Sequence, residues 1–154
     1  MDISKITEYL YIGTQPKGLD YDILRELKIG LIVNMRAKHA PYSDFGKPPI
    51  KTVWIQTRDK IWAPIPTALL EYGAERALEV IRGGGRVFVH CAAGRHRSVA
   101  MAAAILIAMG YNAEQAIGTI KLQRLKADPR AWHIKRKIQK FETSWQRGNN
   151  KKKN

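Results

Sequence analysis

The chain has 154 residues but only one cysteine, Cys91, so it can form no internal disulfide bond. Long apolar runs are also absent: the longest, residues 99–109, is too short to span a bilayer. Residues 1–20 lack the basic start and apolar core of a signal peptide. We therefore expect a cytoplasmic protein without a membrane span.

Acidic residues are scarce. The sequence has 13 Asp and Glu against 27 Lys and Arg, for a formal net charge of +14, and most of the excess follows residue 94. Such a charge favours phosphorylated proteins, anionic lipids or other polyanions as partners, although a solvated basic helix face explains it equally well. No aromatic-rich nucleic-acid motif accompanies the charge, so we do not expect nucleic acid as the partner.

The length and the hydrophobic content of 45% fit one domain with a single core, and we assign it to residues 1–147. Residues 148–154 are polar and end in three lysines and an asparagine, which predicts a disordered basic tail. The chain shows no internal repeat and no long linker.

Strand and helix patterns alternate along the chain. The predicted strands are residues 6–12, 31–35, 52–57 and 87–89. The predicted helices are residues 20–28, 66–82, 97–109 and 113–125, and one that follows Asp128-Pro129, with Asp20 and Asp128 as helix caps. Short apolar strands that alternate with helices indicate an α/β fold with a central, mostly parallel (mixed) sheet flanked by helices. Loops 36–49, 58–64 and 91–97 should meet at the carboxyl edge of that sheet, where ligands bind.

The stretch His90–Ser98 is the most informative part of the sequence. Cys91 lies between an apolar strand and an apolar helix, where unpaired N–H groups and nearby cations stabilise a thiolate. Arg97 can bind two phosphate oxygens, and Ser98 can donate a hydrogen bond to the sulfur as it leaves. The loop that would surround the phosphate consists of Ala92, Ala93, Gly94, Arg95, His96 and Arg97.

Other interpretations of this stretch are weaker. A buried cysteine is often inert, but the arginine and serine at these spacings argue against that here. A zinc site from His90, Cys91 and His96 would lack further cysteines and the usual spacing, so we expect no metal. A sulfur transferase of the rhodanese type also uses a loop cysteine, but the arginine and serine favour phosphate. We expect His90 to order the loop through hydrogen bonds.

The pattern H-C-x-x-G-x-x-R-S at residues 90–98 resembles the signature of the cysteine-dependent protein tyrosine phosphatases. The small size and the start EYLYIG are similar to the dual-specificity branch, over residues 4–145. The resemblance implies a phosphatase of phosphotyrosine, and of phosphoserine and phosphothreonine, in proteins. It also implies a phosphocysteine intermediate on Cys91, phosphate held by Arg97 and the loop amides, and no cofactor.

The resemblance also places a general acid in the loop after the preceding strand, where Asp59 lies; Asp44 is the second candidate. Two sets of residues near the expected site have open roles. One set is Arg36, Lys38 and His39, which either lie at the rim of the pocket or are solvated. The other is Ile61 and Trp62, which either form a wall of the pocket or pack in the core. The alternatives to a protein phosphatase are an enzyme for lipid or polyanionic phosphates, suggested by Arg95 and His96, and a non-catalytic phosphate-binding or nucleic-acid-binding module.

Overall fold

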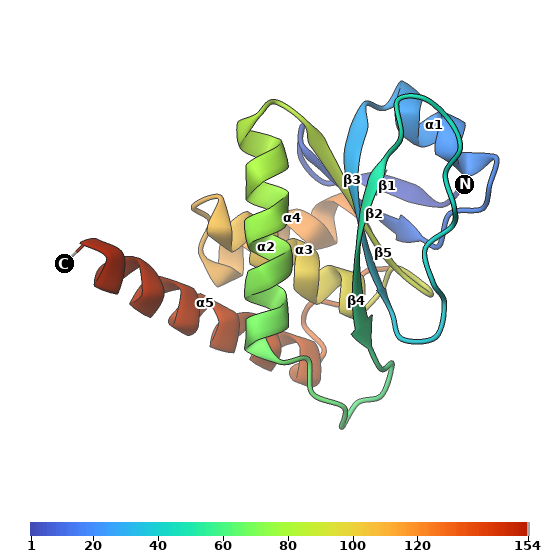
Figure 1. Cartoon of the computed structure of the whole chain (residues 1–154). Coiled ribbons are helices and arrows are strands. Elements are labelled where there is room, and N and C mark those ends of the chain that lie inside the picture. The colour runs from blue at the N-terminus through green and yellow to red at the C-terminus, as the bar shows by residue number, and fades with distance from the viewer. Residues whose placement is uncertain (154) are drawn as a thin grey trace.

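A computed structural model describes residues 1–153 (Figure 1). The elements in chain order are β1 (Ile3–Lys5), β2 (Leu10–Thr14), α1 (Asp20–Glu26), β3 (Ile29–Arg36), β4 (Lys51–Thr57), α2 (Thr67–Arg82), β5 (Arg86–Cys91), α3 (Arg97–Ala108), α4 (Ala113–Gln123) and α5 (Trp132–Lys153). None of the helices in this part of the chain has both the length and the apolar character needed to cross a bilayer.

The strands form one sheet in the order β1-β2-β5-β3-β4. Only β1 is antiparallel to its neighbour, and the other three pairings in the described part of the chain are parallel. The predicted mixed α/β sheet is therefore confirmed. Because β5 lies at the centre, between β2 and β3, the residues that follow it emerge in the middle of the carboxyl edge.

Alternate side chains of the strands pack into two layers. In β5, Val87 and Val89 join the large core beneath α2, α3, α4 and α5, whereas Phe88 joins a smaller cluster beneath α1. Figure 1 shows α1 on one face of the sheet and the other helices on the opposite face. Helix α3 is buried along its length from Arg97 to Ile107, which explains why its sequence after Ser98 is wholly apolar.

The first predicted strand, residues 6–12, is interrupted in the structure. The backbone N–H groups of Ile6 and Thr7 both donate to the Leu10 carbonyl, and this turn makes β1 and β2 a hairpin. Ile6 is itself buried in the core, so apolar residues stand on both sides of the turn. The strand-like composition of residues 6–12 therefore did not reveal the break.

Both predicted aspartate caps have other roles. Asp20 accepts a hydrogen bond at 2.8 Å from the Lys17 backbone, in the turn that precedes α1, and Leu19 occupies the cap position. Asp128 lies in a turn before α5 and donates its backbone N–H to the Arg95 carbonyl. The Asp-Pro pair therefore connects α5 to the loop after β5.

Helix α5 continues through residues 148–153, where the sequence predicted a disordered tail. Side chains 146–152 are exposed, and Trp145 is the last residue of the helix that packs against the core. Helical backbone hydrogen bonds are local, so they can continue after the core contacts have ended. The assignment of the domain to residues 1–147 remains a prediction.

Candidate active site

The signature loop, residues 91–97, connects β5 to α3. Cys91 ends the central strand and Arg97 begins the buried helix. Gly94 has a φ of +62°, and a Cβ added there would lie 2.7 Å from the Gly13 carbonyl oxygen. Only glycine fits this turn without strain, because other residues rarely adopt a positive φ. The loop can therefore curl so that its backbone N–H groups face the cysteine.

Cys91 lies at the bottom of this loop and is only 3% exposed. Its Sγ is 3.2 Å from Ser98 Oγ. Burial acts to raise the pKa of the Cys91 thiol, but hydrogen bonds from Ser98 and Arg95, together with the charge of Arg97, lower that pKa below its usual value. The pairing that the sequence predicted between the thiol and the serine hydroxyl is present.

Arg97 is buried and fixed by two neighbouring strands. Its Nη1 donates to the carbonyls of Met35 (3.1 Å) and Thr57 (2.8 Å), at the ends of β3 and β4. Its Nε is buried and has no acceptor among residues 1–153. A buried, unpaired guanidinium N–H favours binding of an anion, because an unsatisfied donor is costly.

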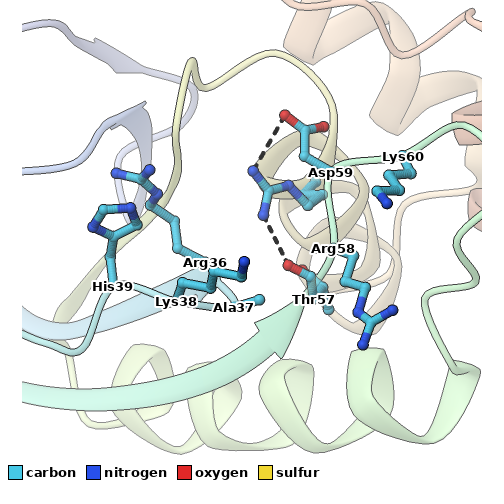
Figure 2. Close-up of a pocket in the computed structure, with 9 residues that line it drawn as sticks. Arg36, Ala37, Lys38, His39, Thr57, Arg58, Asp59 and Lys60 are labelled. Atoms are coloured by element: carbon cyan, nitrogen blue, oxygen red, sulfur yellow. Dashed lines mark hydrogen bonds and ion pairs between the residues drawn. The ribbon is translucent and has the colours of Figure 1, made fainter.

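Asp59 follows β4 and forms an ion pair with Arg97, with 3.3 Å between its Oδ2 and Nη2 (Figure 2). The carboxylate is 58% exposed, so it lies at the mouth of the site above the buried guanidinium. The three loops that were expected at the carboxyl edge of the sheet therefore do meet there. Their meeting point is the Arg97 side chain.

Asp44, the second candidate for the general acid, lies elsewhere. It forms a buried ion pair with Arg25 and accepts hydrogen bonds from the backbones of Gly46 and Ile50, each at 3.0 Å. Its carboxylate therefore stabilises the loop between β3 and β4. Nothing in this arrangement brings it to the signature loop.

A cavity of about 460 Å³ opens beside the Asp59–Arg97 pair. Figure 2 shows the side chains of loop 36–39 on one side of it and those of Asp59 and Lys60 on the other. The lining residues are Arg36, Ala37, Lys38, His39, Thr57, Arg58, Asp59, Lys60 and Arg97. The roles of Arg36, Lys38 and His39 were left open by the sequence. The structure places these three side chains in the wall of the cavity. A wall rich in arginine and lysine, with a single carboxylate, suits an anionic ligand.

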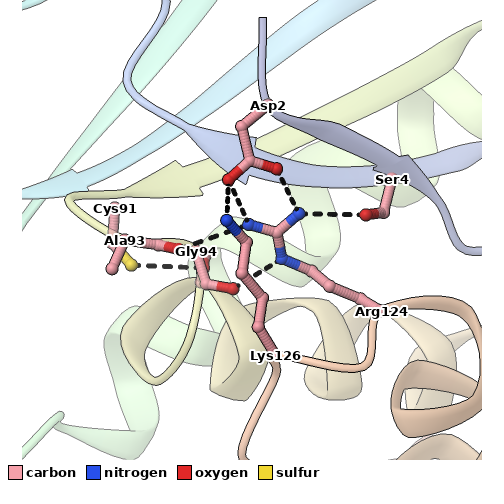
Figure 3. A network of polar contacts seen from close by, with 8 residues as sticks. Asp2, Ser4, Cys91, Ala93, Gly94, Arg124 and Lys126 are labelled. Atoms are coloured by element: carbon pink, nitrogen blue, oxygen red, sulfur yellow. Dashed lines mark hydrogen bonds and ion pairs between the residues drawn. The ribbon is translucent and has the colours of Figure 1, made fainter.

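Arg124 is a residue of the site that the sequence did not indicate. It caps the end of α4 and is almost completely buried. Its Nε donates to the Gly94 carbonyl at 2.8 Å and its Nη2 to the Ala93 carbonyl at 3.2 Å (Figure 3). Its Nη1 binds Asp2 and Ser4 of the N-terminal hairpin, each at 2.9 Å. Arg124 thus holds the back of the signature loop against β1.

The family comparison agrees with this geometry. The family model described as "Dual specificity phosphatase, catalytic domain" matches residues 10–144. The chain belongs to this family. It therefore carries a dual-specificity phosphatase domain, a cysteine-dependent hydrolase of phosphate esters, as the signature had indicated.

Solved structures show that the dual-specificity phosphatase fold extends over nearly the whole chain. Human DUSP28 is 22% identical, with a TM-score of 0.83, over 95% of this chain and 96% of that one. PTPMT1 in complex with PI(5)P is 23% identical, with a TM-score of 0.80, over 92% of this chain and 95% of that one. No curated protein sequence matched the chain.

The two histidines of the phosphatase signature have different surroundings. His90 is buried, and burial lowers its pKa to about 4, so it is neutral at physiological pH. Its Nδ1 is 3.4 Å from the Cys91 carbonyl, which is consistent with the predicted ordering role. His96 is half-buried beside the start of α5: its Nε2 lies 3.6 Å from the Asp128 carboxylate, and its ring packs edge-on against His133. The two imidazoles therefore do not converge with Cys91 on a zinc site.

Proposed function

We propose that the protein hydrolyses phosphotyrosine, and also phosphoserine and phosphothreonine, in phosphorylated proteins. The observation that carries the proposal is the convergence of a thiol of lowered pKa with a buried guanidinium whose Nε has no acceptor among residues 1–153. The first supplies a nucleophile and the second a binding site for the phosphate. The family assignment favours this enzyme over a non-catalytic binding module.

In the first step the Cys91 thiolate attacks phosphorus. The S–P bond forms as the bond between phosphorus and the ester oxygen breaks, and Asp59, as the carboxylic acid, gives its proton to that oxygen. Arg97 and the backbone N–H groups of loop residues 92–96 bind the other phosphate oxygens. The ion pair at 3.3 Å supports the assignment of Asp59, because a carboxyl group next to Arg97 is also next to the bound phosphate.

In the second step water attacks the phosphocysteine. The Asp59 carboxylate takes a proton from this water, the S–P bond breaks, and inorganic phosphate and the thiolate are released. Ser98 Oγ, at 3.2 Å from Sγ, can donate a hydrogen bond to the departing sulfur. No step requires a metal or an organic cofactor. A cytoplasmic setting suits this chemistry, because the thiol must stay reduced.

The test measures release of p-nitrophenol and of phosphate from a phosphotyrosine peptide. We expect Cys91→Ser to abolish both while the protein stays folded. Asp59→Asn should slow hydrolysis of the phosphotyrosine peptide by about 10²–10⁴-fold. Hydrolysis of p-nitrophenyl phosphate should slow much less, because p-nitrophenolate leaves without a proton. Wild-type rates in the Cys91 variant would refute the nucleophile, and equal losses on both substrates would refute Asp59 as the acid. Phosphoserine peptides and phosphoinositides belong in the same panel, because turnover of phosphoinositides alone would refute a protein substrate.

A further inference from the structure

A second hollow lies next to the catalytic cavity, between residues 61–67 and the first half of α5. We call it the α5 groove. Its volume is about 360 Å³, and its walls include Ile61, Trp62, Trp132, Arg136 and Lys140. The Lys137 ammonium donates to the Ala63 carbonyl at 3.1 Å and so holds the two sides together. Figure 1 shows the loop before α2 beside the start of α5.

Large apolar side chains are exposed in this groove. Trp62 is 80% exposed and Trp132 66% exposed, so the core packing considered for Trp62 is wrong. Exposed tryptophans on either side of a hollow are typical of surfaces that bind a partner, because such residues lose the most water-exposed area on contact. The Lys60 ammonium lies 6.0 Å from the Trp62 ring and adds a cation next to it.

The α5 groove is continuous with the active site. A cavity of about 290 Å³ lies between them. Its lining includes the Asp59–Arg97 pair at one end, and it shares Ile61, His133 and Lys137 with the α5 groove. A chain that leaves the catalytic centre can therefore follow this cavity into the groove.

The charge of the groove has one sign. Arg136, Lys137 and Lys140 line it, and no carboxylate does so among the residues that the structure describes. Arg136 and Lys140 form no ion pair in this part of the chain, whereas the neighbouring Lys135 pairs with Glu114. Unpaired cations attract and orient an anionic partner.

We propose that the α5 groove binds an acidic segment of the substrate polypeptide next to its phosphorylated residue. The segment would place apolar side chains against Trp62 and Trp132 and carboxylates against Arg136 and Lys140. A concave groove fits an extended chain better than the flat surface of a bilayer. This inference rests on the proposed function, because it requires a phosphorylated protein as substrate.

The test compares three phosphotyrosine peptides that differ only in the residues on either side of the phosphotyrosine. The first has acidic and apolar flanking residues, the second has lysine and the third has alanine. We expect the wild type to prefer the acidic flank by about tenfold in kcat/KM, mainly through KM. The double variant Arg136→Glu, Lys140→Glu should lose that preference but keep its kcat/KM for p-nitrophenyl phosphate. Trp62→Ala should weaken the preference for the acidic flank, because it removes an apolar contact without changing the charge of the groove.

Arg82→Glu is a charge control away from the groove, because Arg82 is exposed at the far end of α2. It should leave the preference intact. Equal kcat/KM for all flanks would overturn the groove proposal alone, whereas failure to hydrolyse any phosphopeptide would overturn the proposed function as well. Phosphatidylserine vesicles provide a second arm. In one outcome the wild type binds these vesicles, the double variant loses that binding, and all peptides are hydrolysed at equal rates. That combined result would assign the groove to a membrane and overturn the proposal.

Discussion

At the scale of single residues, the pKa of the Cys91 thiol is set by opposing effects of its surroundings. Burial raises that pKa, and hydrogen bonds from Ser98 and Arg95 with the nearby charge of Arg97 lower it by more. Among the groups that lower the pKa, the Ser98 hydroxyl has the largest effect. A thiol in this environment is a thiolate at a lower pH than free cysteine.

We predict that Ser98→Ala raises the pKa of Cys91, because the hydroxyl at 3.2 Å no longer stabilises the thiolate. The pH profile of alkylation by iodoacetamide should move to higher pH, and turnover should fall as the sulfur becomes a poorer leaving group. Cys91 is the only cysteine, so the label reports on it alone. Ser144→Ala is the control, because Ser144 binds Glu71 on α2. An unchanged profile in Ser98→Ala would contradict the assigned role.

At the scale of elements, the signature loop depends on segments that are far apart in the sequence. Its front is held by the ends of β3 and β4 through Arg97, and its back by α4 and β1 through Arg124, which binds Ser4. The side chain of Arg124 also restricts Gly94, because a Cβ added at Gly94 would lie 2.5 Å from Nη2. The position of the loop is thus a property of several elements together.

We predict that Arg124→Leu lowers the free energy of unfolding by about 3 kcal/mol, since it breaks a buried charge network and leaves two carbonyls unpaired. Inhibition by inorganic phosphate should weaken as well, because the loop that binds the phosphate loses its support. Urea unfolding and the inhibition constant are the measurements. Asp2→Asn separates the two effects: it removes the ion pair but keeps the bonds to Ala93 and Gly94. It should therefore retain phosphate inhibition, and an equal loss in both variants would argue against a positioning role of Arg124.

At the scale of the whole molecule, α5 extends further than its contacts. Phe141 is fully buried and its ring stacks on Trp145 at 5.5 Å, but residues 146–152 are exposed. The last turns of this helix therefore carry charge without contributing to the core. This pattern supports the prediction that the domain ends near residue 147.

We predict that removal of residues 148–154 leaves both the thermal midpoint and kcat/KM for p-nitrophenyl phosphate close to those of the full chain. Phe141→Ala, in the packed part of the same helix, should instead lower stability by about 4 kcal/mol. A large drop in the thermal midpoint of the truncated chain would show that the domain includes its last turns.

The local chemistry of this protein could be predicted from the sequence. Cys91, Arg97 and Ser98 lie within eight residues on a contiguous strand, loop and helix, so their spacing indicated the family. The alternation of strands and helices indicated the α/β fold. The order of the strands also placed Asp59 at the same edge. These predictions depend on short-range geometry and on general rules for parallel sheets.

Only the tertiary structure decided which distant side chains reach the site. Arg124 and Asp2 lie 122 residues apart, and neither has a local pattern that predicts their contact. The sequence did not settle whether Arg36 and Lys38 line a cavity or whether Trp62 is exposed, and it wrongly predicted that Asp128 caps a helix. The physical reason is common to these cases: periodicity and spacing determine the backbone of one segment, whereas the contacts of a charged or aromatic side chain depend on where other segments pack.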